Sequence, residues 1–493
     1  MGWIILWAVL GLLLLLIAAI LVNTLRVGIK SVSPQGAPLP PEERVAHYAE
    51  TLSRMLAQET VTVAPGGDLS KIYAFHRLLE ELYPNIHRQL ERVELDGALL
   101  FHWRGSGRSD RLPLLLMSHM DVVPAEGAWS HPPFAGEVEE GIIWGRGAVD
   151  TKGSLCGFMN AVEELLAEGY VPPQDVYLAS SCNEEINGPG APATVDYLAA
   201  QGVKLGLVLD EGGAVADSPL PGLDCKFAMI GLMEKGNAQV KFVAKSKGGH
   251  ASTPPRGTPL ARLAGMVNYI EKKNPFSVQF TPPVEGMFRE MAPYMSMPLR
   301  LVLANLWLFK PLLKSVLPKF SAQAGAMLQT TCAFTMAAGS EAANVIPQEA
   351  SITANLRFMS HERKEATMQK LRAIGERFDV EVQLVSGWDC SGVSSADSYG
   401  YQAVKACVQK TFPEAGVAPY IMLQGSDSRH YERICDCVLR FAPLSIDKQQ
   451  LGSIHGVDEN LSVEALAKAV LFYKELVQGY FSAAPAKSEH RQG

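Results

Sequence analysis

The sequence predicts an α/β protein: a mostly parallel sheet, interrupted by a smaller inserted domain and preceded by one transmembrane helix. Three observations support this fold class. Short apolar runs alternate with amphipathic helical segments, which is typical of a parallel sheet covered by helices. Residues 236–387 read instead as strand, helix, strand, strand, helix, strand. Residues 3–22 form an unbroken apolar run.

The apolar run at residues 3–22 carries no charge. At roughly 1.5 Å per residue it is long enough to cross the hydrocarbon core of a bilayer. It is longer than the apolar region of a secretory signal and no A-x-A site follows it, so we expect an uncleaved single-pass anchor. Arg26 and Lys30 follow the run, and the positive-inside rule would therefore leave the body cytoplasmic. Residues 31–41, rich in Pro, Gly and Ser, read as a linker.

The main domain is expected in two parts, residues 42–235 and 388–482, with a polar tail at 483–493 that we expect to be disordered. In the first part, the patterns predict helices at 42–57 and 155–166 and strands at 112–117, 175–181 and 205–209. In the second part they predict helices at 401–409 and 462–478.

The inserted domain, residues 236–387, is expected to be a ferredoxin-like β-α-β-β-α-β unit. Its predicted elements are strands at 238–244, 328–337, 350–358 and 380–385 and helices at 259–272 and 362–378. Within it, residues 283–319 are rich in Met, Leu, Phe and Trp, with predicted helices at 299–309 and 312–316. This stretch supplies either extra core or an apolar wall or membrane-contacting surface, and both interpretations stay open.

The composition restricts the class of protein. Hydrophobic residues make up 47% of the chain and charged residues 19%, which is globular composition. A net charge of −7 without a Lys/Arg cluster argues against a nucleic-acid partner. The eight cysteines are scattered and form no CxxC pair, so a zinc ribbon or thioredoxin-type motif is absent and buried free thiols are expected.

Histidines and acidic residues recur at the ends of the apolar strands, where open α/β sheets place their sites. His119 closes a predicted strand and Asp121 follows two positions later. A carboxylate that holds the second ring nitrogen orients a metal-binding imidazole. Asp150 lies in a Gly-rich loop before a helix, where it is either an N-cap or a carboxylate shared by two metals.

Three more motifs fit the same chemistry. Glu184 and Glu185 are adjacent after a strand, and burying both requires positive charge, which metal ions would supply. Glu185 would then bind metal and Glu184 would take the proton from the attacking water. Asp210 ends another strand and His455 lies in a late loop. Each motif alone fits an exposed loop or a cap, but together these nitrogen and oxygen ligands suit two zinc ions.

Nine motifs occur in a fixed order: SHMDVVP, GRGAVDTKG, NEE, LDEGG, GGHASTPP, ANVIP, NLRF, GSDSRH and IHGVDE. In this order they resemble the clan MH, family-twenty zinc metallopeptidases over residues 42–478. Within that family the chain is most similar to the subgroup of carboxypeptidase S and the N-fatty-acyl-amino-acid synthase/hydrolases. The resemblance implies a two-zinc hydrolase that cuts an amide bond next to a free carboxylate. It also implies a body on the extracytoplasmic or lumenal side, and an insert that acts as a lid or dimerisation domain.

The resemblance also implies a role for each site residue. One zinc would be held by His119, Asp150 and Asp210, and the other by Asp150, Glu185 and His455. Asp121 would orient His119, and Glu184 would be the general base. His250 would stabilise the oxyanion, from the partner subunit of a homodimer. The implied substrate contacts are Asn344, Arg357, Ser426 and Arg429, with Arg357 gripping the substrate carboxylate in bidentate fashion.

Three functions follow as alternatives. The first is hydrolysis, reversible in principle, of N-acyl amino acids with a long acyl chain. The second is a carboxypeptidase or dipeptidase that releases a C-terminal amino acid. The third is an inactive binding module with the same fold, and the presence of every ligand and of the base argues against it.

Overall fold

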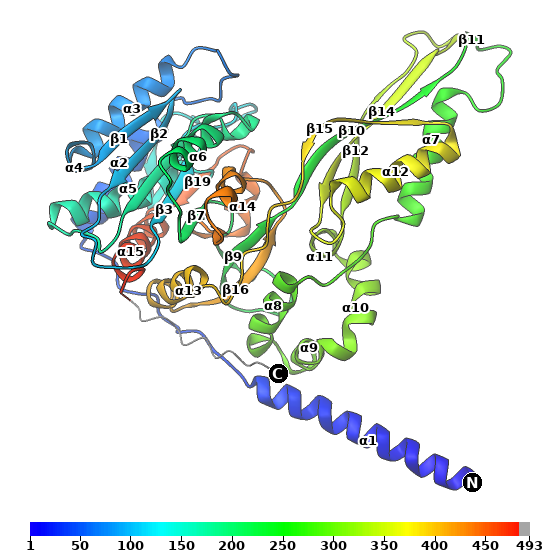
Figure 1. The fold of residues 1–493 in the computed structure, drawn as a ribbon, viewed down its shortest axis with the longest axis horizontal. Coiled ribbons are helices and arrows are strands. Elements are labelled where there is room, and N and C mark those ends of the chain that lie inside the picture. Colours follow the sequence, from blue (N-terminus) through cyan, green and yellow to red (C-terminus); the bar gives the residue numbers. More distant parts are fainter. Residues whose placement is uncertain (483–493) are drawn as a thin grey trace.

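The computed structural model describes residues 1–482, which form an N-terminal helix, a larger lobe and a smaller lobe (Figure 1). The tail at 483–493 lies outside the described residues. Helix α1 (Gly2–Val27) extends away from both lobes and is long and apolar enough to cross a membrane, a property that a signal sequence shares. The bent pair α9 (Met297–Ala304) and α10 (Leu306–Phe320), at 105° to each other, passes the same test only when it is counted as one span.

The larger lobe is built on a ten-stranded mixed sheet in the order β1–β2–β6–β3–β7–β17–β9–β8–β18, with β16 paired to β9. Its strands are β1 (Glu91–Leu95), β2 (Ala98–Trp103), β3 (Leu114–His119), β6 (Val176–Ser181), β7 (Leu207–Asp210), β8 (Val215–Asp217), β9 (Lys226–Glu234), β16 (Ala415–Met422), β17 (Val438–Arg440) and β18 (Ser445–Ile446). The centre, β6–β3–β7–β17, is parallel, as the sequence predicts. Strands β1 and β2 extend it in antiparallel fashion.

Helices cover both faces of this sheet. One face packs against α2 (Glu42–Leu56), α5 (Lys152–Ala167), α13 (Tyr399–Thr411) and α15 (Val463–Gly479). The other packs against α6 (Gly190–Ala200) and the 3₁₀ helix η3 (Asp427–Arg433). Strand β3 is buried on both sides, with Leu114 and Leu116 in the first core and Leu115 and Met117 in the second.

Shorter elements close the ends of the larger lobe. They are α3 (Ser70–Leu82), α4 (Pro84–Gln89), η1 (Glu184–Ile186), α14 (Lys448–Ser453) and a three-stranded sheet of β19 (Asn460–Ser462), β5 (Ile142–Trp144) and β4 (Val138–Glu139).

The smaller lobe contains a four-stranded antiparallel sheet in the order β12–β14–β10–β15. Its elements are β10 (Gly236–Lys245), α7 (Pro259–Lys273), β12 (Thr331–Ala338), β14 (Glu349–Phe358), α12 (Lys364–Phe378) and β15 (Glu381–Trp388), in the predicted order. Apolar side chains of α7 and α12 pack on the sheet and form a separate core. At its far end lies the short pair β11 (Gly249–His250) and β13 (Val345–Ile346) (Figure 1).

Residues 282–328 are helical, with α8 (Pro282–Met291), η2 (Ala292–Tyr294) and α11 (Ala322–Leu328) beside α9 and α10. Buried residues of α8, α9 and α11 form an apolar cluster with β9 and β16, so part of this stretch does supply core. The helix break falls at Asn305, not after residue 309, and Pro311 lies inside α10. The Asn305 side-chain amide donates to the Leu301 carbonyl at 2.9 Å, and such a local side-chain bond competes with helix continuation.

Candidate metal and catalytic site

The site residues lie at the carboxyl ends of three adjacent parallel strands. His119 is the last residue of β3, Glu184 and Glu185 follow β6, and Asp210 is the last residue of β7, followed by Glu211. Because the order is β6–β3–β7, these ends meet at one edge of the sheet. The alternation of strands and helices read from the sequence therefore brings the predicted residues together.

Asp150 lies between two histidines. Its Oδ1 is 3.1 Å from His119 Nε2 and its Oδ2 is 3.0 Å from His455 Nε2. Glu185 Oε2 lies 3.2 Å from the same nitrogen of His455. Ligand atoms of His119, Asp150 and Glu185 lie within 4.8 Å of one another, as a metal site requires. One carboxylate with an oxygen toward each imidazole is the arrangement expected of a ligand shared by two metals.

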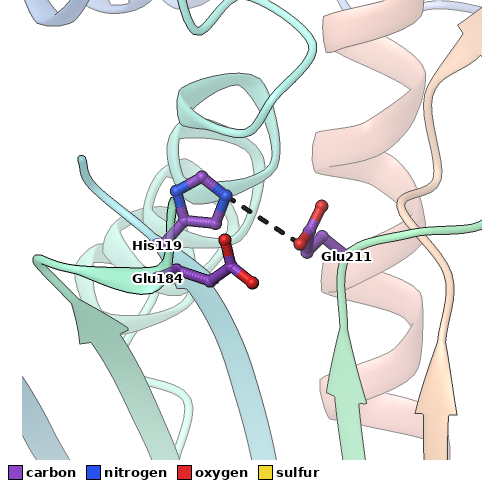
Figure 2. A group of neighbouring side chains, drawn as sticks. All are labelled: His119, Glu184 and Glu211. Atoms are coloured by element: carbon purple, nitrogen blue, oxygen red, sulfur yellow. Dashed lines mark ion pairs between the residues drawn. The ribbon is translucent and has the colours of Figure 1, made fainter. Parts of the chain in front are cut away.

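Glu211, rather than Asp210, faces His119. Its Oε1 lies 3.8 Å from His119 Nε2, and these two residues form a second ligand group with Glu184 (Figure 2). The Asp210 carboxylate instead accepts a hydrogen bond from the Ser428 backbone N–H at 3.0 Å. Successive side chains of an extended chain point to opposite sides, so only one of this pair can face the site. Asp210 as a ligand therefore stays a prediction, and the structure places Glu211 beside His119.

The group carries more negative charge than its imidazoles balance. Burial raises the pKa of Glu184 well above its usual range; His119 opposes this effect, and the charges of Asp427, Glu185 and Asp121 add to it. Burial and Asp150 raise the pKa of Glu211 in the same way. Glu185 Oε1 is buried without a hydrogen-bond partner, a costly state that a cation would relieve. These nitrogen and oxygen donors fit divalent metal ions.

Asp121 organises two of the strand ends. His119 Nδ1 is 2.9 Å from the Asp121 backbone carbonyl and 3.6 Å from its carboxylate, so the carbonyl is the closer partner of the ring. The carboxylate accepts the N–H groups of Glu184 and Glu185 at 3.2 Å each, and the hydroxyl of Thr62. Asp121 thereby positions both the imidazole and the two glutamates.

Glu459 joins the two loops that carry Asp150 and His455. Its fully buried carboxylate accepts the N–H groups of Gly147 at 3.0 Å, Val149 at 2.9 Å and Asp150 at 3.0 Å. It also pairs with the Arg146 guanidinium at 2.6 Å. Glu459 is part of the IHGVDE motif, but the sequence does not indicate that its carboxylate binds the loop that carries Asp150.

His250 and Asn344 lie at the far end of the smaller lobe, where β11 pairs with β13 and is drawn away from β3 (Figure 1). Both are exposed, so the structure does not bring them to the metal-ligand group of the same chain. His250 Nδ1 accepts the Ser252 backbone N–H at 3.1 Å. In the neutral ring the proton is then on Nε2, which makes this nitrogen a hydrogen-bond donor.

The remaining predicted substrate contacts lie where the two lobes join. Arg429 donates to Asn187, just after η1, at 3.0 Å, and its guanidinium lies 4.6 Å from the centre of the Trp388 ring. Arg357 on β14 donates to Asn355 at 3.2 Å, and burial lowers its pKa. Ser426 is fully buried, and its hydroxyl donates to the Glu234 carboxylate at 3.1 Å.

Comparison with known proteins agrees with this geometry. Residues 115–479 match the family described as peptidase family M20/M25/M40. The N-fatty-acyl-amino acid synthase/hydrolase PM20D1.1 of Danio rerio is 34% identical over 418 residues, covering 83% of this chain and 81% of the relative. "Probable carboxypeptidase S-like 2" of Dictyostelium discoideum is 31% identical over 411 residues, covering 82% and 78%.

A solved structure has the same fold. The M20 family metallo-carboxypeptidase Sso-CP2 from Sulfolobus solfataricus superposes with a TM-score of 0.63 at 17% identity, covering 88% of this chain and 99% of that one. The match to the family spans both parts of the larger lobe and the insert between them. This chain belongs to the peptidase family M20/M25/M40, as an enzyme that cleaves amide bonds.

Proposed function

We propose that this protein is a two-zinc hydrolase that cleaves, reversibly, the amide bond of N-acyl amino acids with a long acyl chain. The observation that carries the proposal is the position of Asp150 between His119 and His455, with Glu184 alongside. The Danio rerio relative, named for N-fatty-acyl amino acids, supports the substrate class. One zinc would be held by His119, Asp150 and Glu211, and the other by Asp150, Glu185 and His455.

The bound ions would supply the positive charge that offsets these carboxylates and polarises the amide carbonyl. Glu184 takes the proton of the attacking water as the C–O bond forms, and later gives that proton to the leaving nitrogen as the amide C–N bond breaks. His250 of a second copy donates its Nε2–H to the developing oxyanion. Arg357 and Arg429 hold the free carboxylate of the substrate.

A carboxypeptidase or dipeptidase is the second candidate, because the Dictyostelium discoideum relative is named for that activity. The same base and the same ligands would serve both reactions. The two candidates differ only in whether the group on the scissile carbonyl is an acyl chain or an aminoacyl unit.

The proposal includes a membrane location and a dimer. Helix α1 would anchor the protein as a single span, with the body on the extracytoplasmic or lumenal side. The smaller lobe would pair with that of a second copy and bring His250 to the partner's site.

The test uses the full chain in detergent with zinc restored, and compares N-oleoyl-phenylalanine, N-acetyl-phenylalanine and a blocked dipeptide. We expect the highest kcat/KM for the oleoyl amide, and a loss of about 10²–10⁴-fold in Glu184→Gln. Cleavage of the dipeptide alone would establish the carboxypeptidase. Equal activity of wild type and Glu184→Gln would show that the observed hydrolysis does not come from this site.

A further inference from the structure

The end of helix α1 is fastened to the helical part of the insert by specific polar contacts. The Asn305 side-chain amide donates to Thr24 Oγ1 and to the Ile20 carbonyl, both at 3.2 Å. Asn23 returns a hydrogen bond to Asn305 Oδ1 at 3.2 Å. The Lys30 backbone N–H then donates to the Pro293 carbonyl at 3.1 Å. Helix α9 therefore keeps a fixed position beside the end of α1 (Figure 1).

These contacts set the level of α9 and α10 relative to a membrane that α1 crosses. The uninterrupted apolar run of α1 ends at Val22. Since a helix rises about 1.5 Å per residue, the contact of Asn305 with residues 20–24 lies within about 3 Å of that end. Trp307 donates its ring N–H to Asn305 Oδ1 at 3.3 Å. Tryptophan is enriched at this level, where acyl chains meet headgroups.

The corner formed by α9 and α10 exposes apolar side chains that neither lobe covers. Trp307 is 55% exposed and Leu312 59% exposed on α10, and Met297 is 48% exposed on α9. Helix α10 contains no fully buried residue, although most of its side chains are apolar. Exposed apolar side chains on two helices beside a membrane-crossing helix indicate an interaction surface.

Helices α9 and α10 and the end of α1 carry Lys and Arg but no acidic residue. Residues 291–340 contain no Asp or Glu, whereas α10 carries Lys310, Lys314 and Lys319. Lys310 pairs with Glu285 of α8, and Lys319 is exposed. Arg26 and Lys30, at the end of α1, are also exposed. Anionic headgroups complement such a surface.

We propose that the α9–α10 corner is an interfacial membrane-docking element that binds anionic lipid around the end of α1. The inference rests on the proposed anchoring role of α1. Met297, Trp307 and Leu312 enter the boundary between headgroups and acyl chains, while Lys314 and Lys319 meet the headgroups. A bilayer is the occupant that fits, because the corner stands at the level where the apolar run of α1 ends.

The test uses the full chain with Trp3→Phe and Trp7→Phe, so that α1 contributes no tryptophan signal. The protein is reconstituted into phosphatidylcholine/phosphatidylserine vesicles whose acyl chains are brominated and quench nearby tryptophans. We expect flotation with the vesicles and strong quenching, most of which Trp307→Phe removes. The matched control Trp129→Phe, on a loop of the larger lobe, leaves the quenching unchanged.

A second comparison tests the charge. Lys314→Glu with Lys319→Glu should reduce quenching of Trp307 in phosphatidylserine vesicles, whereas Lys272→Glu with Lys273→Glu on α7 should not. Flotation with quenching that is insensitive to Trp307→Phe, or equal effects of the two lysine pairs, would overturn the inference and leave the anchor intact. A failure to float would refute the anchor itself, while hydrolysis in detergent still reports on the proposed activity.

Discussion

Asp210 and Glu211 are neighbouring carboxylates with separate tasks. Glu211 faces His119, while Asp210 accepts the N–H of Ser428 and so holds the start of η3 against β7. Asp210 is also fully enclosed, at 3% exposure. We therefore expect different consequences when each of the two residues is replaced.

We expect Glu211→Gln to lose bound zinc and Asp210→Ala to retain it. Asp210→Ala leaves the Ser428 N–H without an acceptor and should lower the free energy of unfolding by about 1–3 kcal/mol. Metal analysis of the purified variants and chemical denaturation measure the two effects. Zinc loss in Asp210→Ala with retention in Glu211→Gln would restore the ligand set expected from the resemblance.

Lys235 is a buried amine whose pKa lies below that of an exposed lysine. Burial, with a further contribution from the charge of Arg357, lowers its pKa to about 7, and its Nζ donates to the carbonyls of Ala326 and Gln329 at 2.9 Å each. An unfolded lysine titrates near pH ~10.4. Between these values the unfolded chain holds a proton that the folded chain has released, so this residue makes stability rise with pH.

The stability difference between wild type and Lys235→Met isolates this residue from the others that titrate at high pH. The free energy of unfolding of wild type, minus that of the variant, should rise by roughly 1 kcal/mol per pH unit between about pH 7 and pH 10. Urea denaturation at each pH provides the measurement. A difference that stays flat across this range would mean that the folded protein keeps Lys235 charged.

At the scale of elements, the site depends on loops that are held together by buried polar groups. The loop before α5 and the loop after α14 meet at Glu459, which binds three backbone N–H groups and Arg146. Both partners of this ion pair are enclosed, at 1% exposure for Arg146 and 0% for Glu459. Removing one charge leaves the other buried and unpaired.

Glu459→Gln should therefore destabilise the fold by about 3–5 kcal/mol. The matched control is Glu464→Gln, which removes the exposed partner of Lys468 one helical turn away. Lys468 keeps its pair with Glu414 at 2.8 Å, so this change should cost less than about 0.5 kcal/mol. Thermal and chemical unfolding of both variants gives the comparison. Equal stability of the two would show that the hydrogen bonds to the loop do not need the charge.

At the scale of the whole molecule, a single chain does not bring His250 to the metal ligands. It lies on β11 at the far end of the smaller lobe, whereas the metal ligands lie at the strand ends of the larger lobe. A two-fold dimer through the smaller lobes would give each site the histidine of the other copy.

Mixing inactive subunits tests this arrangement. Glu184→Gln and His250→Ala subunits are each expected to be inactive alone, because each lacks one group. In a two-fold dimer, random mixing would restore about one quarter of wild-type activity, since half of the dimers carry one intact site. Activity after co-refolding at several mixing ratios measures the effect. No recovery in a mixture that forms dimers would place His250 outside the partner's site.

The sequence by itself determined the class of fold and the class of enzyme, and it predicted residues that the structure gathers at the strand ends. Apolar runs that end in His119, Glu185 and Asp210 indicate parallel strands with polar carboxyl ends, because strand burial and helix periodicity are local patterns. The order of the six elements in the insert followed from the same local patterns and matches the structure.

Only the tertiary structure decided which groups face each other. The choice of Glu211 over Asp210 depends on the direction of one side chain at a strand end, and both residues fit the sequence pattern equally well. Glu459 can bind the loop before α5 only because two loops about 310 residues apart in the sequence meet in the fold. The contact of Asn305 with α1 joins segments about 280 residues apart in the sequence. Long-range contacts of this kind arise from packing, which no local pattern contains.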